Sequence, residues 1–425
     1  MRRIQEHLTK SFYVLLSLPA TAMGFALSIQ ISALSWLLTT RYHLNIDEVG
    51  FVWAAGPLAG IFGQVIIGLI SDKVWFWGGR RRPFVLIGGD LAAGMLIALP
   101  NIDVIAAQFG VRSLLAVAIV VALTLDLAIN ISFNPTRSII ADVTPEGNPR
   151  TKGYTWMQTI SGFFGVLAYL IGATLGNYIL IYAGVALVFL FSFVPMFFIT
   201  ESRQYQAAAE ADTKKKPATA TEWGQLFRIY FAHGFSWIGI QTMFVYIIAF
   251  IQQKYFQGIA DQSVINAHSG QIISVAFAIL NTVGFILPAF VLEPVVEKIG
   301  RVRTHLTCVA IMSISYFGMA FWGSTPTMLY ILMSVAGIGW AAVVSLPFAI
   351  MTEKIDQSRT GFFMGIFNLS VVLPQLLVSL LVGTIIKNAA DKNTLFIISG
   401  VALALSALFW TLVKEKRKIG AASDH

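Results

Sequence analysis

Twelve apolar segments, each about long enough to cross a bilayer, constrain the fold of this chain more than any other feature. A spanning helix needs about 20 mostly apolar residues. The segments are 11–37, 48–70, 83–101, 113–141, 153–174, 178–199, 226–252, 268–291, 304–323, 328–350, 360–386 and 393–413. Hydrophobic residues make up 56% of the chain and charged residues 12%, so a water-soluble globule would expose large apolar patches. The sequence therefore predicts an all-α membrane protein with twelve transmembrane helices.

One polar stretch divides the twelve segments into two groups of six. Residues 200–223 form the longest polar connection, and their Ala, Thr and Lys content is typical of a flexible linker. We therefore predict an N-terminal six-helix bundle over 1–200, a cytoplasmic linker over 201–223 and a C-terminal six-helix bundle over 224–425.

The lysines and arginines predict the orientation of these helices in the membrane. Cytoplasmic loops of membrane proteins carry an excess of both residues. If both termini are cytoplasmic, 24 of the 29 Lys and Arg residues fall on the cytoplasmic side. The five on the other side are Arg41, Arg112, Lys254, Lys387 and Lys392. We expect a multi-pass protein of the cell membrane with both termini in the cytoplasm.

The two halves repeat each other at their cytoplasmic loops. "DK" at 72–73 precedes "GRRR" at 79–82 after the second segment, and "EK" at 297–298 precedes "GRVR" at 300–303 after the eighth. The fourth segment ends in "NPTRSIIADV" (134–143), and the tenth ends in "LPFAIMTEKI" (346–355). Paired halves built from smaller repeats are typical of major facilitator transporters, whose substrate site lies between the halves near the bilayer midplane.

These repeated charges are candidates for a gate. An acid at a helix end can pair with a nearby basic cluster, or cap a neighbouring helix, and so hold the cytoplasmic side closed. The alternative is that the basic clusters only anchor the chain on its cytoplasmic side. The predicted gating residues are Asp72, Arg80, Arg81, Arg82, Arg137, Asp142, Glu297, Arg301 and Glu353.

A polar stripe runs along the fourth segment. At 100° per residue, Asn130 lies about 40° from Asp126, Asn134 about 80° and Arg137 about 20°, so the four share one helix face. A charged side chain at the bilayer centre costs at least about 2.5–3.5 kcal/mol, so we expect this face to line a water-accessible cavity. Pro135 removes one backbone hydrogen bond and is expected to kink the helix.

The stripe suggests both a proton site and a substrate site. Burial disfavours the charged form of a carboxylate, so Asp126 is the predicted site for a coupling proton. Asn130 and Asn134 offer the donors and acceptors that sugar hydroxyls need. The alternative is that Asp126 is a structural residue paired with a neighbouring helix.

A second deep acid and several scattered polar residues complete the candidate set. Asp90 lies in the third segment, which is usually peripheral in this architecture, and either structural pairing or proton coupling would explain it. For the others, helix packing or an interfacial position is the alternative to sugar binding. Together with Asp126, Asn130 and Asn134, the predicted substrate-binding residues are Gln30, Trp53, Gln64, Gln158, Trp237, Gln241, Asn281, Asn368 and Gln375.

Several motifs resemble one branch of the major facilitators, the glycoside–pentoside–hexuronide type. "WAAGPLAGIFGQVIIGLISDK" (53–73), "GRRRPF" (79–84) and "LDLAINISFNPTRSIIADV" (125–143) resemble the plant sucrose–proton symporters and their animal and bacterial relatives. "GFALSIQISAL" (24–34), "SWIG" (236–239), "GIGWAAVVSLPFAI" (337–350) and "FNLSVVLPQLLVS" (367–379) are similar to their first, seventh, tenth and eleventh helices. The resemblance implies proton-driven sugar uptake, with the position of Asp126 central to coupling and sugar binding.

This chain departs from the plant pattern in ways that bear on the substrate. The plant proteins have an asparagine near the position of Val166. They also have an acidic pair at the outer end of the seventh helix, where this chain reads "VYIIAFIQQ" (245–253). The short termini and short central loop favour a bacterial inner-membrane protein. The sugar and the details of coupling are therefore expected to differ.

The predicted function is proton-coupled uptake of a disaccharide glucoside such as sucrose or maltose by alternating access. The partners are the sugar, a proton and the lipid bilayer. A monomer is expected, and no nucleic acid, cofactor or metal. Sugar uniport, sodium-coupled symport and a non-transporting sugar sensor on the same fold remain alternatives. Sodium symport usually uses more than one carboxylate near the site, and only Asp126 and Asp90 are deep.

An enzyme is not expected. The six histidines form no H-E-x-x-H motif, and the chain contains no G-x-S-x-G motif. "GIGWAA" (337–342) lies inside an apolar segment, where helix packing explains it better than dinucleotide binding. The lone cysteine, Cys308, excludes an internal disulfide and a cysteine-ligated zinc cluster.

Overall fold

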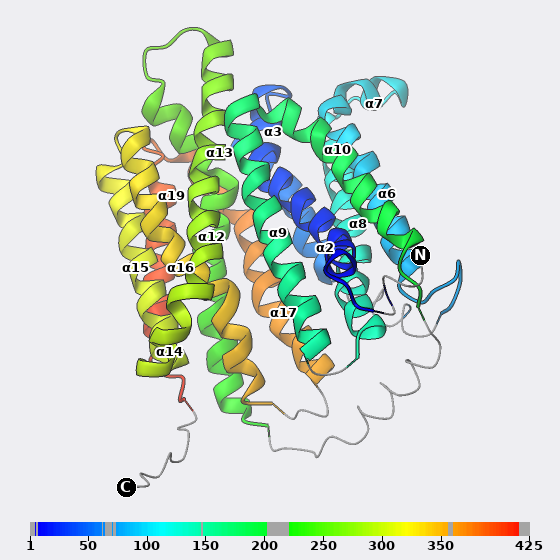
Figure 1. Cartoon of the computed structure of the whole chain (residues 1–425). Helices are drawn as coiled ribbons and strands as arrows, with labels where there is room; N and C mark the ends of the chain where they lie inside the picture. Colours follow the sequence, from blue (N-terminus) through cyan, green and yellow to red (C-terminus); the bar gives the residue numbers. More distant parts are fainter. Residues whose placement is uncertain are drawn as a thin grey trace, which may run out of the picture.

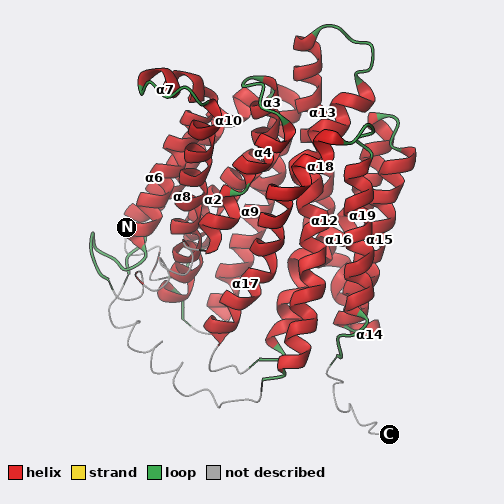
Figure 2. Ribbon diagram, turned by 180° about the vertical axis from the view of Figure 1, so that it is seen from behind, coloured by secondary structure: helices red, strands yellow, loops and turns green. Residues whose placement is uncertain are grey.

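The computed structural model describes residues 5, 7–61, 63, 70, 74–145, 148–201, 221–355 and 360–415. Over these residues the regular structure is helical, apart from one isolated bridge between Phe76 and Gly79 (Figures 1 and 2). Ten of the helices are long and apolar enough to cross a membrane. The predicted all-α membrane fold is confirmed.

The N-terminal half begins with a long first span. It comprises α2 (Lys10–Ile29), the π-helix η1 (Gln30–Leu34) and α3 (Ser35–Thr40), and so extends the predicted 11–37 at both ends. The second predicted span, 48–70, begins in α4 (Ile46–Trp53), and most of residues 62–73 lie outside the described residues. The other helices are α6 (Arg82–Ala98), η2 (Leu99–Asn101), α7 (Ile102–Gln108), α8 (Leu114–Val143), α9 (Asn148–Leu175), α10 (Asn177–Phe193) and η3 (Val194–Phe197).

The C-terminal half contains the remaining helices. They are α12 (Trp223–Tyr255), α13 (Gln262–Leu287), η4 (Pro288–Leu292), α14 (Glu293–Ile299), α15 (Arg301–Trp322), α16 (Pro326–Thr352), α17 (Thr360–Leu377), η6 (Val378–Val382), α18 (Gly383–Asn388) and α19 (Thr394–Trp410). The last predicted span, 393–413, corresponds to α19, which is a shorter apolar helix than the other spans.

Local sequence explains where several helices begin. The side chains of Thr9, Ser113, Asp261 and Thr325 each accept a hydrogen bond from a backbone N–H in the first turn of the helix that follows. Gly300, with φ of 90°, adopts a left-handed conformation between α14 and α15. These signals place helix ends at the two surfaces of the bundle and leave the apolar stretches for its interior.

The helical bundle has two ends that differ in how the halves meet. We call them the linker end, where α2, α6, α9, α12 and α15 begin, and the far end, where α4, α8, α13 and α19 begin. At the far end, the Lys387 ammonium lies 2.9 Å from the Asp47 carboxylate of the other half. The Trp36 indole donates across the same boundary to the Asn266 carbonyl at 2.5 Å. The far end is therefore closed by direct contacts between the halves.

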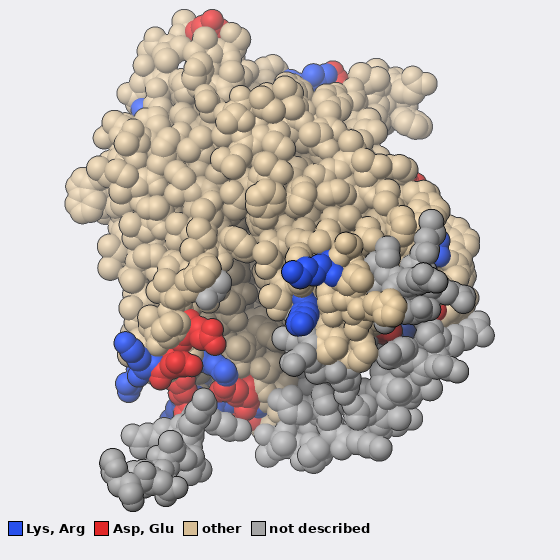
Figure 3. Space-filling model, in the orientation of Figure 1, with Lys and Arg blue, Asp and Glu red and all other residues tan. Residues whose placement is uncertain are grey.

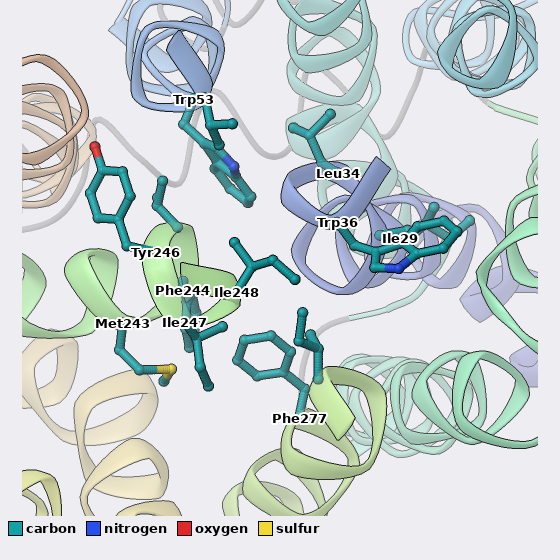
Figure 4. Packing of buried hydrophobic residues seen from close by; sticks show 14 of the residues in the cluster. Ile29, Leu34, Trp36, Trp53, Met243, Phe244, Tyr246, Ile247, Ile248 and Phe277 are labelled. Atoms are coloured by element: carbon teal, nitrogen blue, oxygen red, sulfur yellow. The ribbon is translucent and has the colours of Figure 1, made fainter. Parts of the chain in front are cut away.

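Apolar packing reinforces this closure. Figure 4 shows residues of both halves converging, with Leu34 and Trp36 from the first span and Ile248 and Phe277 from the C-terminal half. Deeper toward the bundle centre, the hydroxyls of Ser32 and Ser274 lie 2.8 Å apart across the boundary. One buried core thus continues from one half into the other.

The linker end is open by comparison. Among the described residues, every ion pair at this end joins two residues of the same half. The space-filling view shows the surface hollowed between the lower ends of the two halves (Figure 3). The structure therefore represents a conformation that is closed at the far end and accessible from the linker end.

Candidate functional site

Asp126 is the buried acid at the centre of the candidate site. It lies on α8 and is 5% exposed. The Gln30 side-chain amide donates to both carboxylate oxygens, at 3.1 and 3.0 Å. Gly56 brings the second span close, since a Cβ atom there would lie 3.4 Å from a carboxylate oxygen. Among the described residues, no basic side chain pairs with Asp126.

Asn130 continues the stripe one turn further along α8. Its side-chain amide donates to the Asp126 backbone carbonyl at 2.7 Å. A Cβ atom on Gly63 would lie 3.1 Å from the Asn130 Cβ atom. Two glycines of the second span, Gly56 and Gly63, thus let its backbone approach the two polar residues closely.

The stripe ends near the linker end in an arginine. Asn134 is half-buried and Arg137 is exposed. The Arg137 guanidinium lies 4.1 Å from the centre of the Phe133 ring, and no acid pairs with it among the described residues. It lies about 16 Å from Asp126 along the helix axis, given a rise of 1.5 Å per residue. The polar face of α8 therefore extends from a buried acid to an accessible cation.

The C-terminal half contributes a wall of aromatic rings. Trp237 and Phe244 on α12 both contact Trp340 on α16, with ring-centre distances of 6.2 and 5.4 Å. Phe244 also meets Phe277 on α13 at 5.3 Å, and Phe277 lies 6.0 Å from Tyr169 of the N-terminal half. Aromatic rings provide apolar faces against which a flat ligand face can stack.

Both indoles of this wall are held by hydrogen bonds. Trp340 donates to the Asn281 side-chain oxygen at 3.2 Å, and Trp237 donates to the His233 ring at 3.0 Å. The Asn281 amide donates back to the Phe277 carbonyl at 2.9 Å. The ring contact between Tyr169 and Phe277 links the wall to the N-terminal half. The rings are therefore fixed in position before any ligand binds.

At the linker end of the N-terminal half, acidic residues hold a basic cluster. Arg80 and Arg81 lie 2.8 and 3.3 Å from the Asp142 carboxylate. The Glu201 carboxylate accepts from the backbone N–H groups of Arg80, Arg81 and Arg82, at 2.8, 2.9 and 2.8 Å. A carboxylate at a helix N-terminus satisfies free N–H groups and favours the positive end of the helix dipole. We call this arrangement of Arg80, Arg81, Asp142 and Glu201 the N-half bracket.

The C-terminal half repeats the arrangement. Arg301 pairs with Glu353, and the Glu415 carboxylate accepts from the Arg301 backbone N–H at 2.5 Å. We call Arg301, Glu353 and Glu415 the C-half bracket. In each half, an arginine after the second span of that half pairs with the acid that ends the fourth. An acid that follows the sixth span caps the same helix start.

The comparisons with known proteins agree with this architecture. The chain matches the model of the Major Facilitator Superfamily over residues 16–368, and a second match covers 229–424. This chain belongs to the Major Facilitator Superfamily. It is accordingly a multi-pass membrane transporter and not an enzyme, as predicted.

Distant relatives of this facilitator can also be identified. It is 23% identical over 433 residues to sucrose transport protein SUC4 of Arabidopsis thaliana, covering 86% of this chain and 82% of that one. It is 25% identical over 416 residues to sucrose transport protein SUT2 of Oryza sativa subsp. indica, covering 82% of each chain. The resemblance to plant sucrose transporters is therefore confirmed. The general alpha-glucoside permease of Schizosaccharomyces pombe is 29% identical over 174 residues, 37% of this chain and 31% of that one.

Solved structures share the fold. The crystal structure of a D-xylose–proton symporter superimposes with a TM-score of 0.70 at 16% identity, over 94% of this chain and 96% of the other. The nucleoside transporter NupG gives a TM-score of 0.70 at 13% identity, over 95% and 100%. At these identities the likeness concerns the facilitator fold alone.

The structure brings some predicted substrate residues of this facilitator together. Gln30, Asp126 and Asn130 form one group, and Trp237 and Asn281 belong to the aromatic wall. Gln241 on α12 is only 3% exposed, and its amide has no hydrogen-bond partner among the described residues.

Four further candidates lie around these groups. Gln158 is exposed on α9, one turn before Gly162, where a Cβ atom would lie 2.3 Å from the Phe285 ring of the other half. Asn368 and Gln375 are half-buried on the face of α17 that includes Val372, which approaches Gly60 of the second span. These three therefore lie on surfaces that face the opposite half. Gln64 lies outside the described residues.

Trp53 is buried and Asp90 is exposed. Trp53 is 7% exposed and donates to the Ser35 hydroxyl, which itself donates to the Val245 carbonyl of the other half at 2.9 Å. Trp53 is thus part of the far-end closure. Asp90 is exposed on α6, because its neighbours Gly88 and Gly89 are the residues that pack against α8 and α10. Its side chain is therefore not buried in the bundle, and no partner contacts it among the described residues.

Two of the predicted gating acids pair with the basic clusters. They are Asp142 and Glu353, from the ends of the fourth and tenth spans. Glu297 is exposed and forms no ion pair among the described residues, and Asp72 lies outside them. The residues that sequence reasoning missed are Glu201, Glu415, Trp340, Tyr169 and His233.

Proposed function

We propose that this facilitator couples sugar uptake to a proton. The observation that carries the proposal is the state of Asp126, a buried carboxylate with an amide partner and no cation among the described residues. An ionised carboxylate is costly to bury without a counter-charge. A proton removes this cost, so Asp126 is suited to bind one during the transport cycle.

The same acid links the proton to movement of the protein. In the present conformation the linker end is accessible, so a proton can leave Asp126 toward that side. A return through an occluded state requires the carboxylate to be neutral again, because ions inside the bilayer are disfavoured. Proton binding and sugar binding are then reciprocally linked, with a coupling free energy of about 1–3 kcal/mol.

The proposed substrate is a disaccharide glucoside such as sucrose or maltose. The relatives support this class, since two are sucrose transport proteins and one is an alpha-glucoside permease. The chemistry of the site supports it as well. Asn130 and Gln241 offer amides for hydroxyl groups, and Trp237 and Trp340 offer ring faces for the apolar side of a pyranose.

The proposed orientation places the linker end in the cytoplasm. The excess of Lys and Arg at this end supports it. Cysteines introduced at Lys214 and at Lys387, in a variant whose only native cysteine is replaced, would be labelled from opposite sides of the membrane. Labelling of both from one side would refute the orientation.

The decisive experiment uses proteoliposomes, a panel of sugars and an imposed pH or sodium gradient. The proposal predicts that a pH gradient alone drives accumulation of a glucoside. It also predicts that Asp126→Asn, which mimics the neutral form, abolishes accumulation and retains downhill exchange, while Asn130→Ala weakens sugar binding. Accumulation by Asp126→Asn under a pH gradient would exclude Asp126 as the coupling site. A response to sodium alone would favour sodium symport, and equilibration without accumulation would favour uniport.

A further inference from the structure

His233 is a buried histidine that the transport mechanism above does not use. It lies on α12 and is 2% exposed. Its ring stacks on Phe367 of α17, with 5.0 Å between ring centres and 14° between the planes. Its Nε2 atom accepts the Trp237 indole N–H at 3.0 Å, one helical turn further along α12. Nδ1 has no partner among the described residues.

These contacts define the chemical state of the imidazole. A nitrogen that accepts an N–H bond carries no proton, so the ring is neutral with its hydrogen on Nδ1. The other tautomer and the imidazolium would both point an N–H group at the indole N–H. Neither is compatible with the observed arrangement. No ion pair is formed by His233 with an acid or base among the described residues.

The bond fixes the indole of Trp237. The Trp237 ring is half-buried and meets Trp340 edge to face, with 6.2 Å between centres and 81° between planes. Trp340 is tethered separately through its own N–H to Asn281. Each indole of the wall therefore has one hydrogen bond at its N–H group, and His233 supplies the one for Trp237. Without it the Trp237 side chain is free to turn about its two side-chain torsions.

We propose that His233 is a positioning residue that holds the Trp237 ring for stacking against the pyranose ring of the sugar. The inference rests on the proposed function, because it takes a sugar as the ligand of the aromatic wall. His233 acts on Trp237 through its acceptor atom Nε2, and it does not touch the sugar itself.

The test compares two replacements of His233, each made in the wild type and in a Trp237→Phe variant. His233→Gln places an amide oxygen close to the position of Nε2 and so keeps an acceptor, whereas His233→Phe keeps the stacking on Phe367 and removes the acceptor. Sucrose and maltose binding is measured by titration calorimetry in nanodiscs. We expect His233→Gln to bind within about threefold of the wild type and His233→Phe to bind about tenfold more weakly, the loss of roughly one hydrogen bond. In a Trp237→Phe background the two replacements should be indistinguishable.

Two binding outcomes would overturn the inference. One is an equal loss for His233→Phe in both backgrounds, since His233 would then act without Trp237. The other is a loss for His233→Gln as large as that for His233→Phe. If His233→Phe does not fold, His233→Leu takes its place as the variant without an acceptor.

A spectroscopic measurement separates failure of this inference from failure of the proposed function. If the wild type binds neither sucrose nor maltose, the proposed substrate is wrong, but the link between His233 and Trp237 can still be tested. The near-ultraviolet circular dichroism band that Trp237→Phe removes should persist in His233→Gln and disappear in His233→Phe. Persistence of that band in His233→Phe would overturn the inference whatever the substrate.

Discussion

The Gln30 amide nitrogen lies 3.1 and 3.0 Å from the two carboxylate oxygens of Asp126, and it does so from the first residue of the π-helix η1. Two residues later, Ser32 contacts Ser274 of the other half. Single-turn π-helices occur frequently at functional sites. The first span therefore contacts the buried acid on one side and the far-end closure on the other within one helical turn.

We expect Gln30→Leu to impair proton-driven uptake. The substitution leaves the Asp126 carboxylate without the amide donor, and a hydrogen bond to a charged group contributes about 1.5–3 kcal/mol. That corresponds to a loss of roughly tenfold or more in initial uptake under a pH gradient. In an Asp126→Asn background, which retains downhill exchange only, Gln30→Leu should leave that exchange unchanged. Gln108→Leu, which removes an exposed glutamine at the end of α7 that forms no hydrogen bond among the described residues, is the control and should leave uptake near normal.

We expect Gly50→Ala to open the far end. A Cβ atom at Gly50 would lie 2.4 Å from the Ser379 carbonyl and 2.5 Å from the Tyr246 hydroxyl, so α4 and η6 must separate. Labelling of an engineered cysteine at Ser32, in a Cys308→Ala background, should become faster from the far side. Gly24→Ala serves as the control, because no atom lies within 4 Å of the added methyl group. Unchanged labelling in Gly50→Ala would show that the closure does not depend on this approach.

A charge exchange tests the Asp47–Lys387 pair at the far end. The two side chains are 22% and 43% exposed, so the pair should contribute only about 0.2–1 kcal/mol to the closed state. Asp47→Lys and Lys387→Asp should each increase far-side labelling at residue 32 by up to about fivefold, and the double variant should restore it. Added salt screens the ion pair, so it should speed far-side labelling when Asp47 and Lys387 are both present. It should not change labelling in the Asp47→Asn variant. If far-side labelling in the double variant is as fast as in either single variant, pairing of the two side chains in the membrane is contradicted.

The N-half bracket should stabilise the N-terminal half. Glu201 is 8% exposed and accepts from three backbone N–H groups. Glu201→Ala removes all these acceptors, and we expect a loss of at least about 1.5–3 kcal/mol in the free energy of unfolding. The measurement is thermal unfolding in one detergent. Glu297→Ala is the control, since Glu297 is exposed and forms no ion pair among the described residues. Equal melting temperatures for the two variants would argue against a bracketing role.

Asp142→Asn separates gating from stability within the same bracket. It removes the charge that pairs with Arg80 and Arg81 but leaves the Glu201 contacts in place. If the bracket controls conformational exchange, turnover should fall while sugar affinity stays within about tenfold of the wild type. Normal turnover in Asp142→Asn would leave the arginines with only an anchoring role.

Features that depend on one helix were predictable from the sequence. The spacing of Asp126 and Asn130 predicts one face, and the amide of Asn130 does contact the backbone at Asp126. The spans and the resemblance to sucrose transporters also follow directly from local apolar length and motif. The repeated acids Asp142 and Glu353 were also recognisable as gating candidates, although their arginine partners became clear only in the structure.

Features that depend on how the helices face one another were not predictable. Asp90 lies within an apolar segment, and such a segment does not reveal which face packs inside the bundle and which is exposed. Gln30 meets Asp126 across 96 residues of sequence. Trp340 was attributed to packing, and its hydrogen bond to Asn281 becomes visible only when α13 and α16 are side by side. Glu201 looked like the start of a linker, because its partners lie on another helix.

The two brackets also set an order in the synthesis of the protein. Glu201 is the last described residue before the linker, and Arg80 and Asp142 both precede it. Glu415 stands in the same relation to Arg301 and Glu353. The acid that completes each bracket is therefore synthesised after all six helices of the same half. The first half can complete its bracket while the second is still being translated, because none of the partners comes from beyond residue 201.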